Sequence, residues 1–168
     1  MDALLIGCGH DHTLRLQMHN TVIQKLVTLD NNPDTSPDVL HDLEVLPYPF
    51  EDESFGQIHA YEVLEHTGTQ GDAEFFFGQF FEFWRILEPD GLLVGSCPAV
   101  DSPWLWGDPS HKRYIGPESF TFLDQDEYER QLGKTAMSDF RNLWKGDFKL
   151  RVSEQKDHTW MFALQANK

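Results

Sequence analysis

Two glycines close to the start of the chain, Gly7 and Gly9, follow directly after an apolar run at residues 3–6. Glycine has no Cβ, so a glycine turn lets the backbone bend sharply and come close to a bound ligand. A second apolar run, residues 25–29, ends at Asp30, near the ~20-residue spacing at which a carboxylate binds the hydroxyls of a ribose. This combination indicates a nucleotide-binding site built from a glycine turn and an acid.

Asp30 also has a purely structural explanation. Asn31, Asn32 and Pro33 follow it, and all three are common turn residues, so in this alternative Asp30 only opens a turn. The spacing from the glycine turn favours the ribose role, and the residues that follow favour the structural one. The residues themselves leave both roles open.

Histidine and cysteine side chains raise the question of a metal ion. His10 and His12 lie on either side of Asp11, but no carboxylate or cysteine stands at metal-ligand spacing, so we expect no metal site. Cys8 and Cys97 fit neither a disulfide framework nor a metal cluster. We expect both to be buried thiols.

Short apolar runs without helical periodicity predict the strands that position these residues. Besides the two runs already named, the runs lie at residues 39–43, 55–63 and 92–97. Charged side chains gather where they end, among them Asp42, Glu62 and His66. Because the carboxyl ends of parallel strands form one edge of a sheet, where ligands bind, we expect the site at this edge. We expect His66 either to cap the strand end or to lie in the wall of this site.

Residues 72–87 have the clearest helical periodicity, with Asp72 or a neighbour as the expected N-cap and residues 89–91 ending the helix. At ~100° per residue, one wide apolar face is expected to pack in the core. This face consists of Ala73, Phe76, Phe77, Phe80, Phe81, Phe83, Trp84 and Leu87. The opposite face consists of Glu74, Gly78, Glu82 and Arg85. Residues 10–26 and 118–132 are compatible with two further helices.

The end of the chain predicts an antiparallel hairpin, because residues 148–153 and 159–164 alternate with period two around a polar turn. Strands that alternate with helices or loops and then end in a hairpin are typical of one α/β fold class. We therefore expect a Rossmann-like, doubly wound and mostly parallel sheet with an antiparallel C-terminal hairpin. At 168 residues, we expect a single domain over residues 1–168.

The composition excludes some partners. With 28 acidic and 13 basic residues, the formal charge of −15 repels a polyanion, so nucleic acid is a poor substrate. No apolar run approaches the ~18 residues that a membrane span needs, and no secretory leader is recognisable. We expect a soluble, cytoplasmic protein that binds neither nucleic acid nor membrane.

Three segments together resemble the class I S-adenosylmethionine-dependent methyltransferases. They read L-P-Y-P-F-E-D-E-S-F at 46–55, Y-E-V-L-E-H at 61–66 and F-W-R-I-L-E-P-D-G at 83–91. The resemblance covers about residues 3–98 and implies S-adenosyl-L-methionine as the cofactor. The cofactor-binding residues that it implies are Gly7, Cys8, Gly9, Asp30, Asn31, Asp42, Leu43, Tyr61 and Glu62.

Within this resemblance, the glycine turn passes under the methionine part of the cofactor and Asp30 binds the ribose hydroxyls. Asp42 and Leu43 flank the adenine, while Tyr61 and Glu62 line the pocket of the methyl donor. A cationic sulfonium and a ribose suit carboxylates and a close backbone, whereas a pyrophosphate needs a helix N-terminus without nearby acids.

The chain departs from the family at several positions. Asp11 stands where the family has a third glycine, and Leu5 stands where it has an acid, so the methionine end is expected to be bound differently. The family has a covering helix before the first strand, where this sequence has Met1 and Asp2. The pocket is then either open or completed by the long loop or by a second subunit of a homodimer.

Residues 107–113, G-D-P-S-H-K-R, resemble a stretch of some relatives that act on small hydroxyl-bearing or saccharide-like substrates. His111 is the candidate general base, because histidine titrates near neutral pH and methylation of an oxygen requires loss of its proton. Asp108 is expected to orient it. In the structural alternative, His111 only closes a turn with Asp108. The surrounding loop, residues 100–117, has the length and irregularity of a lid.

The favoured function is methyl transfer from S-adenosyl-L-methionine to a small-molecule or glycan-like acceptor, with oxygen as the preferred acceptor atom. One alternative is a non-catalytic cofactor-binding or interaction protein on the same fold. A nicotinamide-dependent oxidoreductase is the weaker alternative, because it needs a third glycine and Asp11 would repel the pyrophosphate.

Overall fold

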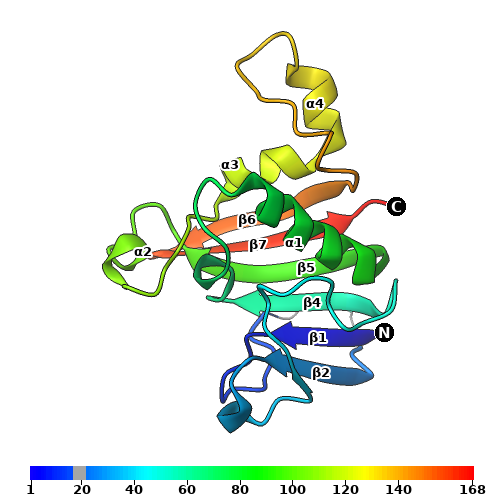
Figure 1. Ribbon diagram of the computed structural model, residues 1–168, viewed down its shortest axis with the longest axis vertical. Coiled ribbons are helices and arrows are strands. Elements are labelled where there is room, and N and C mark those ends of the chain that lie inside the picture. Colours follow the sequence, from blue (N-terminus) through cyan, green and yellow to red (C-terminus); the bar gives the residue numbers. More distant parts are fainter. Residues whose placement is uncertain (17–21) are drawn as a thin grey trace.

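The computed structural model describes residues 1–16 and 22–168. Within them, a seven-stranded sheet has the strand order β3-β2-β1-β4-β5-β7-β6 (Figure 1). The first five strands are parallel to one another, and β7 is antiparallel to both of its neighbours. The strands are β1 (Asp2–Ile6), β2 (Lys25–Asp30), β3 (Val39–Leu40), β4 (Phe55–Tyr61), β5 (Leu87–Pro98), β6 (Phe148–Lys156) and β7 (Thr159–Ala166).

Helices cover one face of this sheet. The longest, α1, lies in front of β7 and β5, whereas α4 projects beyond the sheet (Figure 1). The α-helices are α1 (Ala73–Ile86), α2 (Trp104–Gly107), α3 (Pro117–Phe120) and α4 (Gln125–Gln131). The 3-10 helices are η1 (Pro33–Thr35), η2 (Leu64–His66) and η3 (Thr121–Leu123).

The core lies between α1 and the sheet. As predicted, Asp72 caps α1, because its carboxylate accepts a hydrogen bond from the backbone N–H of Phe75. Phe80 and Phe83 are fully buried with their ring centroids 5.6 Å apart, and Phe80 also packs against Phe120 at 5.5 Å. Edge-to-face aromatic pairs of this kind stabilise a core beyond the area that they bury.

The opposite face of α1 is a correction to the sequence analysis. Glu82 was grouped with Glu74 and Arg85 opposite the apolar face, yet it is only 7% exposed. The segment before β4 packs against this side of the helix, and the backbone N–H of Tyr48 donates to Glu82 at 2.8 Å. Glu82 also forms an ion pair with Arg85 at 2.7 Å, so this carboxylate joins the helix to the segment.

Three other predicted elements differ from the structure. Residues 10–16 and 22–24 are irregular and residues 25–26 belong to β2, so no helix forms in the described part of residues 10–26; residues 17–21 lie outside it. The strand expected at 39–43 shortens to β3. The helix expected at 118–132 divides into three short ones, because Asp124 has extended backbone angles and caps α4.

The predicted fold class is confirmed. The sheet is mostly parallel, and β6 and β7 form the expected antiparallel C-terminal hairpin. Cys8 and Cys97 are buried free thiols, as predicted. In the residues that the structure describes, no helix has the length and apolarity to cross a membrane.

Candidate functional site

The strand order changes direction at β1, which pairs in parallel with β2 on one side and with β4 on the other. In open α/β sheets, the crevice beyond the carboxyl ends of strands at such a switch point is where ligands bind. Gly7, Asp30 and Glu62 lie at the carboxyl ends of β1, β2 and β4. The predicted strand-end residues therefore meet at one edge of the sheet, the left edge in Figure 1.

A hollow of about 280 Å³ opens at this edge, and we call it the first hollow. It brings together seven of the predicted cofactor-binding residues: Gly7, Gly9, Asp30, Asn31, Asp42, Leu43 and Glu62. The other lining residues, most of which were not predicted, are His41, Glu44, Val63, His66, Thr67 and Lys112. Only His66 was expected in the wall of the site. The others come from loops whose paths have no local sequence signal.

The glycine turn forms the floor of the first hollow. Gly7 and Gly9 have φ angles of +58° and +54°, a region that favours glycine. A Cβ added to Gly7 would lie 2.3 Å from Cγ2 of Val63, so a larger residue does not fit there. A Cβ on Gly9 would meet nothing within 4 Å, so the backbone at Gly9 leaves open space for a ligand.

Asp30 is held in place by two backbone donors. The N–H of Gly9 donates to Oδ2 at 2.9 Å, and the N–H of Asn32 donates to Oδ1 at 2.9 Å. Asp30 therefore opens the turn, as the structural alternative predicts. Each carboxylate oxygen accepts more than one hydrogen bond, so both remain able to bind ligand hydroxyls in a fixed orientation.

Acidic side chains dominate the first hollow. Asp30, Asp42 and Glu62 line it, and Lys112 forms an ion pair with Glu44 at 2.8 Å. The hydrogen bond from Lys112 holds the pKa of the Glu44 carboxyl below its ordinary value. The electrostatic potential of such a hollow favours a cationic ligand over a pyrophosphate.

Two predicted cofactor residues, Tyr61 and Cys8, lie elsewhere. Alternate side chains of a strand share one face of a sheet, so Tyr61 lies on the same face as His59, whose Nδ1 is 2.7 Å from the Tyr61 hydroxyl. Its hydroxyl accepts hydrogen bonds from the backbone N–H groups of Arg15 and Leu16, at 3.2 and 3.1 Å. Cys8 packs in the same small cluster as Tyr61, so neither lines the first hollow.

A second hollow of about 340 Å³ adjoins the first, and Glu62 and His66 line both. It contains the two predicted catalytic residues, His111 and Asp108, together with Glu65 and Trp104. The 3-10 helix η2, directly after β4, positions Glu65 and His66. The loop after β5 supplies the opposite wall.

His111 and Asp108 are oriented by short-range hydrogen bonds. Nδ1 of His111 lies 3.0 Å from the carbonyl oxygen of Leu105, so it carries the proton and donates, which leaves Nε2 as an acceptor. Nε2 lies 3.8 Å from Oδ2 of Asp108. The Ser110 hydroxyl and N–H both donate to Oδ1 of Asp108 and hold its pKa below the ordinary value.

Glu65 is the most unusual group of the second hollow. Its side chain is 0% exposed, and burial raises the pKa of its carboxyl to about 8. Within residues 1–16 and 22–168, neither carboxylate oxygen accepts a hydrogen bond. The rings of His66 and His111 meet edge to face beside it, with centroids 4.6 Å apart.

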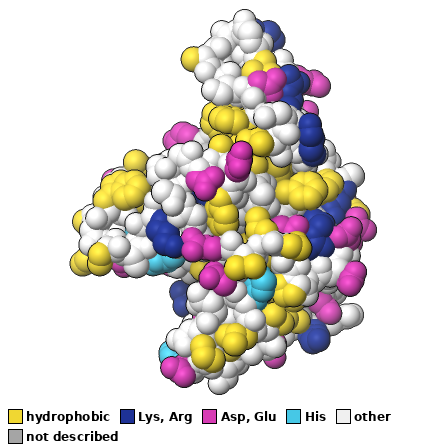
Figure 2. All heavy atoms as spheres, in the orientation of Figure 1, with side chains coloured by type: hydrophobic (Ala, Val, Ile, Leu, Met, Phe, Trp, Pro, Cys, Tyr) yellow, Lys and Arg dark blue, Asp and Glu magenta, His cyan; other side chains and the backbone are white. Residues whose placement is uncertain are grey.

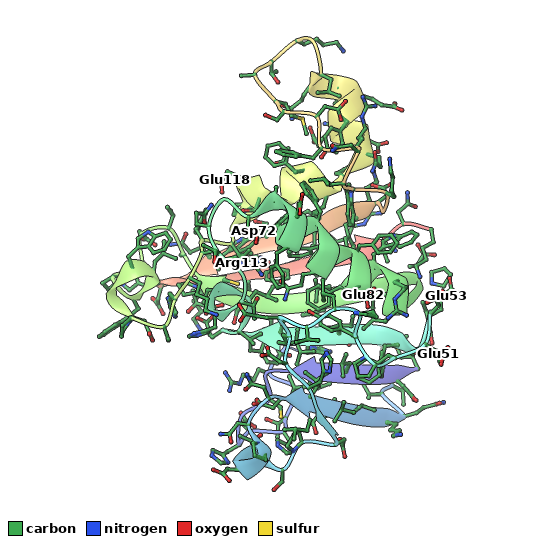
Figure 3. The ribbon with its side chains drawn as sticks, viewed as in Figure 1. Glu51, Glu53, Asp72, Glu82, Arg113 and Glu118 are labelled. Carbon is green, nitrogen blue, oxygen red and sulfur yellow. The ribbon has the colours of Figure 1, made fainter. Side chains whose placement is uncertain are left out.

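The predicted lid is partly anchored. Trp104 and Trp106 are 67% and 61% exposed on α2, where hydrophobic side chains gather at the left edge of the molecule (Figure 2). Arg113, which belongs to the predicted lid, is buried beside α1 (Figure 3). Its guanidinium donates to the carbonyl of Leu64 and to Thr67 Oγ1, both at 3.0 Å, so it fixes the end of the loop.

Solved methyltransferases share this architecture. A proposed methyltransferase from Haloferax volcanii, in complex with the Trm112 methyltransferase activator, matches with a TM-score of 0.65 and 15% identity over 99% of this chain and 82% of its own. An S-adenosylmethionine-dependent methyltransferase from Archaeoglobus fulgidus matches with a TM-score of 0.58 and 16% identity, over 98% of this chain and 85% of its own. The N-methyltransferase NodS from Bradyrhizobium japonicum WM9, in complex with S-adenosyl-L-homocysteine, matches with a TM-score of 0.60 and 16% identity. The match covers 99% of this chain and 78% of NodS.

No protein-family model matches the chain, and no curated protein matches its sequence. The TM-scores of 0.58–0.65 establish a shared fold, at sequence identities of 15–16%. The chain therefore has the fold of the class I S-adenosylmethionine-dependent methyltransferases, as its sequence resemblance implied.

Proposed function

We propose that this protein is an S-adenosyl-L-methionine-dependent methyltransferase that methylates an oxygen of a small-molecule or glycan-like acceptor. One observation carries the proposal: two hollows meet at Glu62 and His66, the first lined by the glycine turn and Asp30 and the second by His111 and Asp108. The fold, which is shared with S-adenosylmethionine-dependent methyltransferases, supports the methyl-transfer part of this proposal.

The residues of the first hollow fit this cofactor. The open space above Gly9 leaves room for its methionine part, and the fixed carboxylate of Asp30 suits its ribose hydroxyls. Asp42 and Leu43, which follow Asp30 in the chain and line the same hollow, would flank the adenine. When bound, the cofactor supplies a methyl group on a positively charged sulfur, and the acidic lining of the hollow suits that charge.

The residues between the hollows prepare the acceptor. Glu62 lines both hollows and would place a carboxylate beside the sulfonium of a bound cofactor. We propose that Nε2 of His111 removes the proton of the acceptor hydroxyl, because the hydrogen bond to Leu105 leaves this nitrogen free. Asp108 acts as a positioning residue, 3.8 Å from that nitrogen.

The charge and the hollow sizes favour a small acceptor. A formal charge of −15 opposes nucleic acid, and a hollow of about 340 Å³ has the size of a small-molecule site. Two buried free cysteines fit a reducing compartment, so we also propose a cytoplasmic location. The predicted second subunit stays a prediction, which light scattering with and without S-adenosyl-L-homocysteine tests.

A nicotinamide-dependent oxidoreductase is less well supported. Such enzymes place the pyrophosphate at a helix N-terminus directly after the glycine turn. Here the described residues after the turn, 10–16, contain no helix, and the hollow is acidic. A non-catalytic cofactor-binding protein differs from the proposed enzyme only in turnover.

Isothermal titration tests the proposal directly. We expect S-adenosyl-L-homocysteine and S-adenosyl-L-methionine to bind one per chain, and NADH not to bind. A panel of hydroxyl-bearing acceptors then separates an enzyme from a non-catalytic binder. Absence of heat at millimolar S-adenosyl-L-homocysteine would overturn the proposed cofactor, and NADH binding in its place would support the oxidoreductase.

A further inference from the structure

Three side chains of the second hollow form a cluster, and two of them, Glu65 and His66, have no part in the proton removal proposed above. Glu65, His66 and His111 each offer one ligand atom, and these three atoms all lie within 4.8 Å of one another. Glu65 and His66 come from η2, whereas His111 comes from the loop after α2. Two elements far apart in the sequence therefore converge on one point.

The hydrogen bonds of both histidines leave one ring nitrogen free. Nδ1 of His111 donates to the Leu105 carbonyl, as described above. Nδ1 of His66 lies 3.1 Å from Ser110 Oγ, whose own hydrogen is donated to Asp108 at 2.6 Å. Because the hydroxyl has a single hydrogen, His66 must be the donor to Ser110. Metal-binding histidines characteristically donate their other N–H to a carbonyl or a carboxylate-linked group in this way.

Glu65 supplies the independent observation. Its side chain is fully buried, lines the hollow and has no hydrogen-bond donor in the described residues. Burial of a carboxylate is costly unless the group is paired with a cation or fully hydrogen-bonded. A cation bound between this carboxylate and the two imidazoles would supply the missing partner.

We propose that Glu65, His66 and His111 bind a divalent transition-metal ion. Two neutral imidazoles and one carboxylate suit Zn²⁺ and also Co²⁺, Fe²⁺ or Mn²⁺. Three protein ligands would leave at least one coordination position open, and all three side chains line the same hollow. If the protein transfers methyl groups as proposed, the open position would take an oxygen of the acceptor. In the metal-bound protein, His111 is then a ligand, and its role as proton acceptor applies to the metal-free protein.

The test uses the metal alone, without any methyl donor. Chelator-treated protein is dialysed against Zn²⁺ and its metal content is measured, and Co²⁺ absorption in the visible range reports the coordination geometry. We expect one ion per chain with the spectrum of a four- or five-coordinate site. Glu65→Gln, His66→Ala and His111→Ala should each lower the affinity by about 100-fold or more.

His10→Ala is the matched control, because His10 is exposed and lies near the first turn rather than in the cluster. It should leave the affinity unchanged, and circular dichroism checks that each variant is folded. If Glu65→Gln fails to fold, the two histidine variants still decide the outcome. Equal metal binding in all variants, or no stoichiometric binding by the wild type, would overturn the site. Because no methyl donor is present, this result is independent of cofactor binding.

Discussion

Asp30 accepts hydrogen bonds from the backbone N–H groups of Gly9 and Asn32. These bonds fix its carboxylate beside the glycine turn, where we propose that it binds the ribose of the cofactor. Replacement by alanine removes the bonds to the ribose hydroxyls, and hydrogen bonds to a charged group are worth roughly 1.5–3 kcal/mol each. We expect Asp30→Ala to weaken S-adenosyl-L-homocysteine binding at least about tenfold. Isothermal titration measures the change, and thermal unfolding confirms that the variant is folded.

Asp34→Ala is the control for this experiment, since Asp34 is exposed, lies four residues away and does not line the hollow. Its affinity should equal that of the wild type. A folded Asp30→Ala variant with an unchanged dissociation constant would mean that the ribose is held elsewhere.

His111 is the residue on which the proposed chemistry depends. Whether it accepts a proton or binds a metal, its loss should affect turnover and spare the first hollow, which it does not line. We expect His111→Ala to lower kcat by about 100-fold or more while the affinity for S-adenosyl-L-homocysteine stays nearly intact. If His111 only closes the turn with Asp108, the variant will instead lose thermal stability and raise the acceptor KM, with kcat little changed.

At the level of residues, the sequence predicts what a strand end determines. Gly7, Asp30 and Glu62 follow apolar runs, and parallel strands bring such ends together. Tyr61 could not be assigned in this way, because the face to which a side chain points depends on the register of β4. The contact between His66 and His111 depends on the path of a loop, which local pattern does not determine.

At the level of elements, β4 shows how one strand serves two faces. Its alternate residues Gln57, His59 and Tyr61 form a buried polar row, with His59 Nε2 donating to Gln57 at 2.9 Å and the Tyr61 hydroxyl 2.7 Å from Nδ1. The Tyr61 hydroxyl in turn holds the backbone of Arg15 and Leu16. The row therefore fixes the segment after the glycine turn against the sheet.

This row predicts a dependence of stability on pH. Burial lowers the pKa of His59 from 6.5 to about 4, so between these values the unfolded chain binds a proton that the folded protein does not. The contribution of neutral His59 to the free energy of unfolding is fully present above pH 6.5. As the pH falls toward 4, the free energy of unfolding decreases by about 3 kcal/mol from this source. Urea unfolding of the wild type and of His59→Asn at neutral pH and near pH 4 measures it.

The wild type should lose more stability than His59→Asn over this interval, because the carboxylates titrate in both proteins. Equal losses in the two would show that His59 is not buried in its neutral form. The exposed His10→Ala variant should follow the wild type.

Helix α1 shows what periodicity can and cannot predict. Its cap at Asp72 and its phenylalanine face follow from local residue types. The burial of Glu82 does not, because it results from a segment that crosses this side of the helix and presents the N–H of Tyr48. The division of residues 118–132 likewise results from an Asp124 cap inside a stretch that looks continuous in the sequence.

For the whole molecule, the alternation of apolar runs and the final hairpin were sufficient to predict the fold class. The strand order places the ends of β1, β2 and β4 side by side, and the two hollows follow from this order together with the loop after β5. The anchoring of that loop by Arg113 was not predictable. Arginine is usually exposed, and the polar residues around Arg113 do not indicate that its side chain is buried.

A crystal structure with S-adenosyl-L-homocysteine bound tests the central claim most directly. We predict that the ribose hydroxyls contact Asp30, that the amino acid part lies over Gly9, and that the sulfur faces Glu62 and His66 at the junction of the two hollows. A ligand bound outside the first hollow, or one with its ribose away from Asp30, would contradict the account.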